Sequence, residues 1–294
     1  MPPAVHVAPE SDRAIEAAVT AAGGELAGWD EAQALVWLDS SPDSLPDTLP
    51  DAVRWVQLPS AGVEAWMDRI DGGRRWTSAA GAYGRPVAEH ALMLMLAGAR
   101  RLGEFARATS WSRPPLMPLE RSTVAIVGAG GIGRALIDLL EPFRVEVLAV
   151  TRRGRDGTLP AERLGDVWPR AHHVVIAAPA TGATRHLVGA AELEAMREDA
   201  WLVNVARGSL VDTDALVAAL AAGAIGGAAL DVTDPEPLPD GHPLWTEPRA
   251  LITPHVANPD ATLRRYLAEL VEENVRRFAA GDELASMIDP EAGY

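Results

Sequence analysis

Six short, almost continuous apolar segments recur between residues 123 and 255, and they constrain the fold of this chain more than any other feature. They read TVAIVG, VEVLAV, HHVVIAAP, AWLVNVA, IGGAALDV and ALITPH, and helix-like segments are interleaved with them. Strands that are apolar along their whole length are typical of a parallel sheet covered by helices on both faces. The sequence therefore predicts a doubly wound α/β domain in this region.

A second, smaller α/β domain is predicted from the first third of the chain. The apolar runs AVHVA, ALVWL and VRWVQL alternate with a helical segment over residues 11–22, which indicates another small parallel sheet. A long helix is expected over residues 85–109, and an amphipathic helix over residues 261–284 follows the last strand. We expect this final helix to pack back onto the first domain.

Composition excludes several classes of protein. With 26 basic and 41 acidic residues the formal net charge is −15, which repels a nucleic-acid backbone and means that an anionic ligand needs dedicated cations. No cysteine is present, so disulfides, thiolate metal sites and cysteine nucleophiles are excluded. No run approaches the roughly 20 apolar residues of a membrane span. We expect a cytoplasmic protein that binds neither nucleic acid nor membrane.

Three glycines in the spacing G-x-G-x-x-G directly follow the first apolar run and open a helix. Gly128 permits a tight turn, Gly130 lets a pyrophosphate approach the backbone, and Gly133 lets the helix pack closely on the strand. The N–H groups at the helix N-terminus suit an anion. The loop, which includes Gly131 and Ile132, therefore predicts a dinucleotide-binding site.

The second apolar run is followed by Thr151, Arg152 and Arg153, at a position where many dinucleotide-binding chains have an acid. An acidic residue would accept hydrogen bonds from the ribose hydroxyls of NAD and would repel a 2′-phosphate. Guanidinium groups reverse this preference because they form charge-assisted hydrogen bonds to phosphate oxygens, and the Thr151 hydroxyl can add another. We therefore expect a preference for NADP(H), with NAD(H) as the other cofactor. The alternative interpretation is a solvated surface turn.

Three further motifs follow in order along the chain: VNVARGSLVDTDAL, ALDVTDPEPLPDGHPLW and LITPHVAN. With the glycine loop upstream, they resemble the D-isomer-specific 2-hydroxyacid dehydrogenases, a family that includes glyoxylate/hydroxypyruvate reductases. The resemblance implies two Rossmann-like α/β domains with parallel sheets and an active site in the cleft between them. Residues 1–92 would form the first part of a substrate domain, to which the C-terminal helix and tail, residues 258–294, return. Residues 93–257 would form the inserted dinucleotide-binding domain.

The resemblance also implies the catalytic residues. Arg207 would hold the substrate carboxylate and carbonyl, Glu236 would orient the acid, and His255 would donate the proton. These residue types suit the chemistry, because a 2-oxo acid takes a hydride from the nicotinamide at C2 and a proton on its oxygen. Imidazolium is an acid matched to neutral pH, a nearby carboxylate favours it, and a planar guanidinium matches paired oxygens.

Further positions are implied in the same way. The backbone N–H groups of Ala61 and Gly62 would hold the substrate carboxylate, and Arg207 and His255 would be the other substrate-binding residues. Asp231 would receive the nicotinamide amide. The other histidines have no carboxylate or histidine at metal-ligand spacing, so we expect no metal site. The remaining cofactor contacts would come from Pro179, Thr184, Val205 and Ala206.

These observations predict an oxidoreductase that transfers a hydride between NAD(P)H and a small 2-oxo acid to give a D-2-hydroxy acid. Glyoxylate or hydroxypyruvate is the first candidate, and a bulkier 2-oxo acid is the alternative substrate. The apolar helix AEHALMLMLAGARRL is a plausible homodimer surface. The alternative function is a non-catalytic dinucleotide sensor like the family's transcriptional corepressors, which also keep the arginine, glutamate and histidine. In formate dehydrogenases, another branch of the family, a glutamine is expected to pair with the histidine, so Glu236 argues against that activity.

Overall fold

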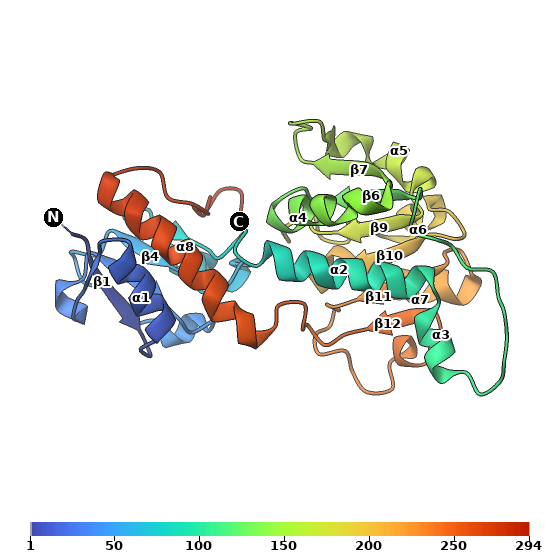
Figure 1. The fold of residues 1–294 in the computed structure, drawn as a ribbon, viewed down its shortest axis with the longest axis horizontal. Coiled ribbons are helices and arrows are strands. Elements are labelled where there is room, and N and C mark those ends of the chain that lie inside the picture. The colour runs from blue at the N-terminus through green and yellow to red at the C-terminus, as the bar shows by residue number, and fades with distance from the viewer. Residues whose placement is uncertain (1, 294) are drawn as a thin grey trace. The chain divides into compact units, whose positions relative to one another are not determined.

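The computed structural model describes residues 2–293, apart from the side chains of Asp260 and Ala261. The chain divides into two compact units. Unit 1 contains the residues up to Tyr83 and those from Asn258 onward, and unit 2 runs from Gly84 to Ala257. The blue and red ends of the colour range therefore both fall in unit 1 (Figure 1). Unit 2 is an insertion in a discontinuous unit 1.

Unit 1 is built on a parallel sheet in the order β2-β1-β3-β4-β5. Its strands are β1 Ala4–Ala8, β2 Glu25–Leu26, β3 Ala34–Trp37, β4 Trp55–Gln57 and β5 Arg75–Thr77. Its α-helices are α1 Arg13–Ala21 and α8 Asp260–Ala280, and its 3-10 helices are η1 Trp29–Glu31, η2 Pro42–Ser44 and η3 Glu64–Arg69.

Helices α1 and α8 lie side by side in unit 1 (Figure 1). Asp12 caps α1 by accepting hydrogen bonds from the N–H groups of Ala14 and Ile15 at 2.9 and 3.1 Å, which satisfies two donors that a helix start leaves unpaired. The Phe278 ring of α8 lies 5.5 Å from the Trp55 ring of β4. The C-terminal helix therefore packs within unit 1.

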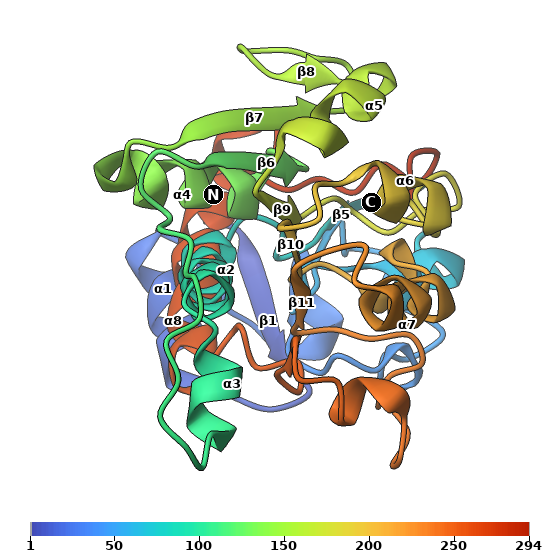
Figure 2. The same cartoon turned by 90° about the vertical axis from the view of Figure 1, so that its right-hand side faces the viewer.

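Unit 2 is built on a parallel sheet in the order β12-β11-β10-β9-β6-β7-β8 (Figure 2). Its strands are β6 Thr123–Val127, β7 Glu146–Thr151, β8 Leu159–Pro160, β9 His173–Ile176, β10 Trp201–Asn204, β11 Gly227–Leu230 and β12 Ala250–Ile252. Its α-helices are α2 Gly84–Ala99, α3 Leu102–Arg107, α4 Gly131–Leu140, α5 Leu164–Val167, α6 Ala190–Ala195 and α7 Thr213–Ala222. Its 3-10 helices are η4 Glu141–Phe143, η5 Ala161–Arg163, η6 Trp168–Arg170, η7 Gly208–Leu210 and η8 Pro243–Trp245.

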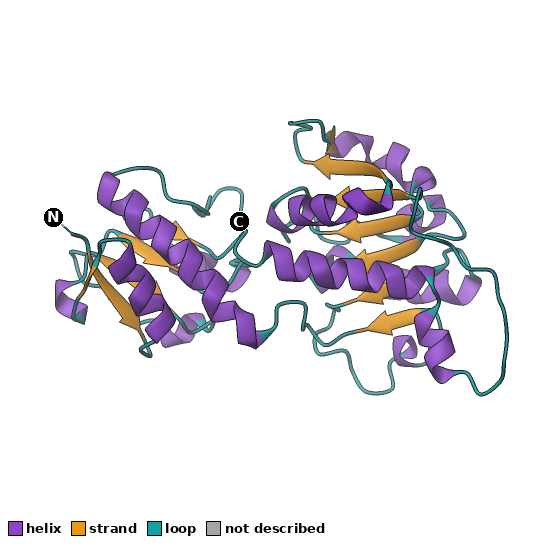
Figure 3. Cartoon of the chain, viewed as in Figure 1, coloured by secondary structure: helices purple, strands orange, loops and turns teal. Residues whose placement is uncertain are grey.

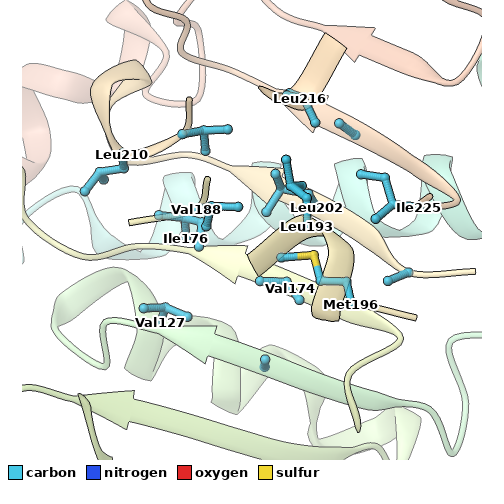
Figure 4. Close-up of a cluster of buried hydrophobic side chains, with 14 of the residues drawn as sticks. Val127, Val174, Ile176, Val188, Leu193, Met196, Leu202, Leu210, Leu216 and Ile225 are labelled. Atoms are coloured by element: carbon cyan, nitrogen blue, oxygen red, sulfur yellow. The ribbon is translucent and has the colours of Figure 1, made fainter. Parts of the chain in front are cut away.

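Helices cover both faces of the unit 2 sheet (Figure 3). On one face α2 approaches β10 so closely that a Cβ on Gly98 would lie 2.4 Å from the Trp201 ring. On the other face, Leu193 and Met196 from the α6 region and Leu216 of α7 pack with strand residues such as Val174 and Leu202 (Figure 4). All six predicted apolar strands are present, and the predicted α/β class with parallel sheets is confirmed.

Three details differ from the sequence-based expectation. Strands β2, β5 and β8 were not predicted, because each has only two or three residues and lies outside any longer apolar run. The helix expected over residues 85–109 is interrupted at Arg101, whose φ of 51° is left-handed. The units divide at Gly84 rather than between residues 92 and 93, because all of α2 belongs to unit 2. Its first residue already contacts α4, where a Cβ on Gly84 would lie 2.7 Å from the Gly131 carbonyl oxygen.

His173 is a buried, titratable side chain in the core of unit 2. It is 1% exposed, and neither of its ring nitrogens has a hydrogen-bond partner among the described residues. Burial, assisted by the neighbouring His172, lowers the pKa of His173 from the ordinary 6.5 to about 4. Unfolding returns the ring to water, so the unfolded chain binds a proton at a higher pH than the folded chain does.

Acidification should therefore destabilise the protein through this residue between pH 6.5 and about 4. A pKa difference of this size lowers the free energy of unfolding by about 3 kcal/mol over the whole window. Below the window this residue causes no further change. His173→Leu should flatten the pH dependence of the free energy of unfolding, measured by urea titration at pH 7 and pH 4.5. His186→Asn, which changes a histidine side chain that is 42% exposed, is the control and should keep the wild-type slope. An unchanged slope in His173→Leu would contradict this account.

Candidate active site

Three adjacent parallel strands place the predicted catalytic side chains at one edge of the unit 2 sheet. Arg207 follows β10, Glu236 follows β11 and His255 follows β12. The carboxyl ends of parallel strands lie at the same edge, so the three loops are neighbours. The loops of Arg207 and Glu236 touch, because a Cβ on Gly208 would lie 1.9 Å from the carbonyl oxygen of Thr233.

His255 and Glu236 form a directly hydrogen-bonded pair. Nδ1 of His255 lies 2.6 Å from Oε1 of Glu236, and the two side chains are 50% and 41% exposed. Oε2 of Glu236 accepts a hydrogen bond from the Thr233 N–H at 3.4 Å. The carboxylate thus fixes the ring through Nδ1 and leaves Nε2 as the atom that can give or take a proton.

Arg207 is held by the buried Asn204 at the end of β10. The Asn204 side-chain amide donates to the Arg207 carbonyl at 2.8 Å, and its Oδ1 accepts from the Ala206 N–H at 3.1 Å. Nη1 of Arg207 donates to the Ala206 carbonyl at 2.8 Å. Asn204 is fully buried, so this turn is fixed from inside the unit. Sequence reasoning missed Asn204.

Asp231 is a buried carboxylate that holds the loop of His255. Its oxygens accept hydrogen bonds from the Thr253 hydroxyl at 2.6 Å and from the N–H groups of Val256 and Ala257 at 3.0 and 3.1 Å. Burial alone would raise the pKa of Asp231, but these hydrogen bonds and one from His90 hold it below the ordinary value. The sequence suggested a contact with the nicotinamide amide, which stays a prediction. The structure also shows that Asp231 holds the loop around His255 in place, which the sequence did not indicate.

His90 of α2 is a second residue that sequence reasoning missed. Its Nε2 lies 2.9 Å from Oγ1 of Thr253 and 3.3 Å from Oδ1 of Asp231, and its side chain is 14% exposed. In the sequence, His90 is one of the histidines without a carboxylate or histidine at metal-ligand spacing. Its partner Thr253 is 163 positions further along the chain, so no spacing rule could have connected them.

The glycine loop has the geometry of an anion site. Gly128 has a φ of 104°, and a Cβ there would lie 2.5 Å from the backbone of Ala177. A Cβ on Gly133 would lie 2.2 Å from the Gly128 carbonyl oxygen, whereas a Cβ on Gly130 would meet nothing within 4 Å. The loop lies between β6 and β9, where the strand order reverses, which is the position at which such sheets bind ligands.

Gly131 and Ile132 begin α4, so the backbone N–H groups of the first turn of this helix lie beside the open space at Gly130. These N–H groups have no partner within a helix and carry its positive dipole end. The open space at Gly130 and the N–H groups of the first turn of α4 together fit a pyrophosphate.

Two exposed arginines lie in the turn after β7, the strand that pairs with β6. Arg152 and Arg153 are exposed, and Gly154 follows with a φ of 61°. Thr151 makes hydrogen bonds within this turn, and its contact with the cofactor stays a prediction. Its Oγ1 accepts from the Gly154 N–H at 3.2 Å and lies 2.7 Å from Oγ1 of Thr158, which donates to the Arg155 carbonyl. The Thr151 proton is thus used within the turn, and the arginines are the candidate phosphate ligands.

The other predicted cofactor residues also lie at carboxyl ends of unit 2 strands. The loop after β9 is closed by the Thr184 hydroxyl, which donates to the Pro179 carbonyl at 2.8 Å. Val205 and Ala206 follow β10 and are buried. The predicted cofactor residues are thus distributed over the loops after β6, β7, β9, β10 and β11.

Ala61 and Gly62 belong to unit 1 and are described within that unit alone. They follow β4, and among the described residues their N–H groups have no hydrogen-bond partner. The Tyr83 hydroxyl donates to the Pro59 carbonyl at 2.8 Å, which fixes the start of this loop, and burial raises the pKa of Tyr83 to about 12. Two neighbouring unpaired N–H groups can receive a carboxylate.

No cluster of three or more histidine, aspartate or glutamate side chains in residues 2–293 could hold a metal ion. Within the same residues, no helix combines the length and the apolar character needed to cross a bilayer.

Comparison with known proteins identifies the family. The model of the D-isomer specific 2-hydroxyacid dehydrogenase NAD binding domain matches residues 92–257. This chain belongs to that family. An uncharacterized protein of Corynebacterium melassecola from the proB 3′ region is 43% identical over 255 residues, which cover 82% of this chain and 84% of that protein. A glyoxylate reductase of Thermofilum pendens is 34% identical over 220 residues, which cover 70% of this chain and 65% of that enzyme.

A solved structure agrees with this assignment. The D-isomer specific 2-hydroxyacid dehydrogenase of Xanthobacter autotrophicus, in complex with NADPH and MES, matches over the full length of both chains with a TM-score of 0.84 and 27% identity. The dehydrogenase described here is therefore an NAD(P)-dependent oxidoreductase that reduces 2-oxo acids. The predicted family and class of reaction are confirmed, and the alternative of a non-catalytic sensor is not favoured.

The glycine loop provides a matched pair of variants. Gly130→Ala should fold with a wild-type melting temperature and raise the KM for the dinucleotide at least tenfold, because the new methyl group enters the open anion space. Gly133→Ala should instead destabilise the protein by about 1 to 3 kcal/mol, since its methyl group meets the Gly128 backbone. Thermal melts and initial rates measure both. Equal effects of the two variants on melting temperature would contradict the assignment.

Proposed function

We propose that this dehydrogenase reduces glyoxylate or hydroxypyruvate with NADPH to the corresponding 2-hydroxy acid. The observation that carries the proposal is the His255–Glu236 pair, at 2.6 Å, on the strand edge that also presents Arg207. The Thermofilum relative, a glyoxylate reductase, supports the substrate class. The NADPH complex of the Xanthobacter structure supports the cofactor.

The roles of the chain's residues follow from their chemistry. When bound, the nicotinamide supplies the hydride for C2 of the substrate. The Arg207 guanidinium binds the carboxylate and the carbonyl oxygen, and it polarises the carbonyl toward attack. Protonated His255 then gives its Nε2 proton to the same oxygen, while Glu236 holds Nδ1 and stabilises the charged ring. The N–H groups of Ala61 and Gly62 receive the substrate carboxylate.

The phosphates of the cofactor would be held at two places. The α4 N-terminus and the open space at Gly130 take the pyrophosphate. Arg152 and Arg153 take the 2′-phosphate, because a chain with a net charge of −15 repels an anion everywhere except at such local cations. Pro179 and Thr184 lie against the adenosine.

His255→Ala should lower kcat at least a hundredfold and leave the dissociation constant for NADPH within about twofold, because it removes the proton donor and no phosphate contact. Arg207→Lys should raise KM for the 2-oxo acid and lower kcat together, since an ammonium group cannot make the paired contact. Steady-state rates and fluorescence titration with NADPH measure these effects. Normal turnover in His255→Ala would refute the catalytic assignment.

Replacing both Arg152 and Arg153 by serine should weaken NADPH binding about ten- to several-hundredfold and change NADH binding far less, because charge-assisted hydrogen bonds contribute roughly 1.5 to 3 kcal/mol each when sheltered. The preference of the wild type for NADPH should decrease as salt is added. The charge-matched control is Arg163→Ser/Arg170→Ser, which removes two exposed arginines that pair with Asp166 and Glu146. Equal use of both cofactors by the wild type would mean that the two arginines are only a surface turn.

We also propose a cytoplasmic homodimer formed through unit 2. The large apolar side chains of the α2–α3 region and of the connector that follows are unusually exposed for a soluble surface. This exposed set contains Met93, Leu102, Phe105, Trp111 and Leu116, of which Trp111 is 87% exposed. The apolar composition of α2 and a groove lined by Leu92, Met93, Leu96 and Leu102 are consistent with a partner on this surface.

Light scattering should give a particle of twice the 31.2 kDa chain mass at micromolar concentration. Leu102→Glu should shift it toward the monomer, because the partner would have to desolvate a charge. Glu141→Gln, on the surface after α4, is the control and should leave the dimer intact. A wild-type particle of one chain mass would exclude this proposal.

A further inference from the structure

His255 has a backbone conformation that its neighbours must enforce. Its φ of 53° is left-handed, a region that residues with a Cβ occupy only when the surrounding structure fixes them there. Half of its side chain is exposed, so packing around the ring does not supply the constraint. The direction of the ring therefore depends on what holds residues 253–257.

Asp231 contacts this segment on both sides of His255. Its carbonyl accepts the His255 N–H at 2.8 Å. Its carboxylate accepts the hydroxyl of Thr253, two residues before, and the N–H groups of Val256 and Ala257 that follow. The backbone that carries His255 is thus held by the buried Asp231 and its carboxylate, while Glu236 holds the ring itself through Nδ1.

His90 fixes the position of that carboxylate. The Thr253 hydroxyl has one proton, and at 2.6 Å from Oδ1 of Asp231, which can only accept, this proton lies on the Thr253–Asp231 bond. Oγ1 of Thr253 is therefore the acceptor in its 2.9 Å contact with His90, and the ring donates from Nε2. The same Nε2 lies 3.3 Å from Oδ1 of Asp231, so one N–H group serves both atoms.

We propose that His90, acting through Thr253 and Asp231, is a positioning residue that sets the orientation of His255. The proposal rests on the proposed role of His255 as proton donor. Within the described part of the chain, the polar contacts of the His90 side chain are to Thr253 and Asp231, so its effect on His255 passes through this buried network. A proton donor displaced by about 1 Å can lose as much as a hundredfold in rate, so fixing this loop has a direct effect on turnover.

The test uses paired variants of the full-length enzyme. His90→Phe and Thr253→Val keep the shape of each side chain and remove its polar atoms, and each should lower kcat about ten- to a hundredfold. His90→Gln and Thr253→Ser keep a donor and a hydroxyl, respectively, and each should recover most of the lost kcat. The dissociation constant for NADPH should change much less than kcat in all four variants, because none of them touches the glycine loop that is proposed to hold the pyrophosphate.

The double variant His90→Phe/Thr253→Val should be no slower than the slower single variant, because both residues act through one network. Wild-type kcat in His90→Phe, or equal losses in His90→Phe and His90→Gln, would overturn the proposal. If His90→Phe does not fold, the Thr253→Val and Thr253→Ser pair tests the same network. His255→Ala separates the two ideas: an inactive His255→Ala beside a fully active His90→Phe refutes only the positioning role, whereas an active His255→Ala refutes the proposed function.

Discussion

The parallel pairing of β10, β11 and β12 is the constraint on which the candidate site depends. In a parallel sheet every strand ends at the same edge, so three segments that are far apart in the sequence must present their following loops together. Arg207, Glu236 and His255 each come from one of these loops. An antiparallel arrangement would send one of the three to the opposite edge, and the set would not form.

Buried polar side chains hold the loops at this edge of the sheet in defined positions. Asn204 shapes the turn that carries Arg207, and Asp231 holds the loop that carries His255. Each of these side chains is almost fully buried, and each satisfies backbone donors that would otherwise be unpaired inside the unit. The side chains of His255 and Glu236 are 50% and 41% exposed, so the direction of His255 depends on this inner layer and on its bond to Glu236 rather than on packing around it.

The sequence was a good guide to features with a local signal and a poor one to contacts across the chain. The six apolar strands were predictable because burial on both faces of a parallel sheet requires apolar residues at consecutive positions. Gly128, Gly130 and Gly133 were predictable because their spacing encodes a turn and a helix start. The pairing of His90 with Thr253 was not, since Thr253 lies 163 residues further along the chain and the contact depends on how α2 packs against the sheet. The contact between the Thr151 and Thr158 hydroxyls was not predictable for a similar reason, because Thr158 lies across a turn whose shape the sequence does not reveal.

The central claim is that Arg207, Glu236 and His255 at this edge of the sheet catalyse the reduction of a 2-oxo acid. Product formation by the wild-type enzyme tests this claim most directly. Purified protein is incubated with NADPH and, separately, glyoxylate, hydroxypyruvate or phenylpyruvate, and both NADPH loss and the hydroxy acid formed are quantified. The account predicts that glyoxylate or hydroxypyruvate gives one molecule of 2-hydroxy acid for each NADPH oxidised, at a rate well above that with phenylpyruvate. Binding of NADPH without its oxidation by any of the three acids would contradict it.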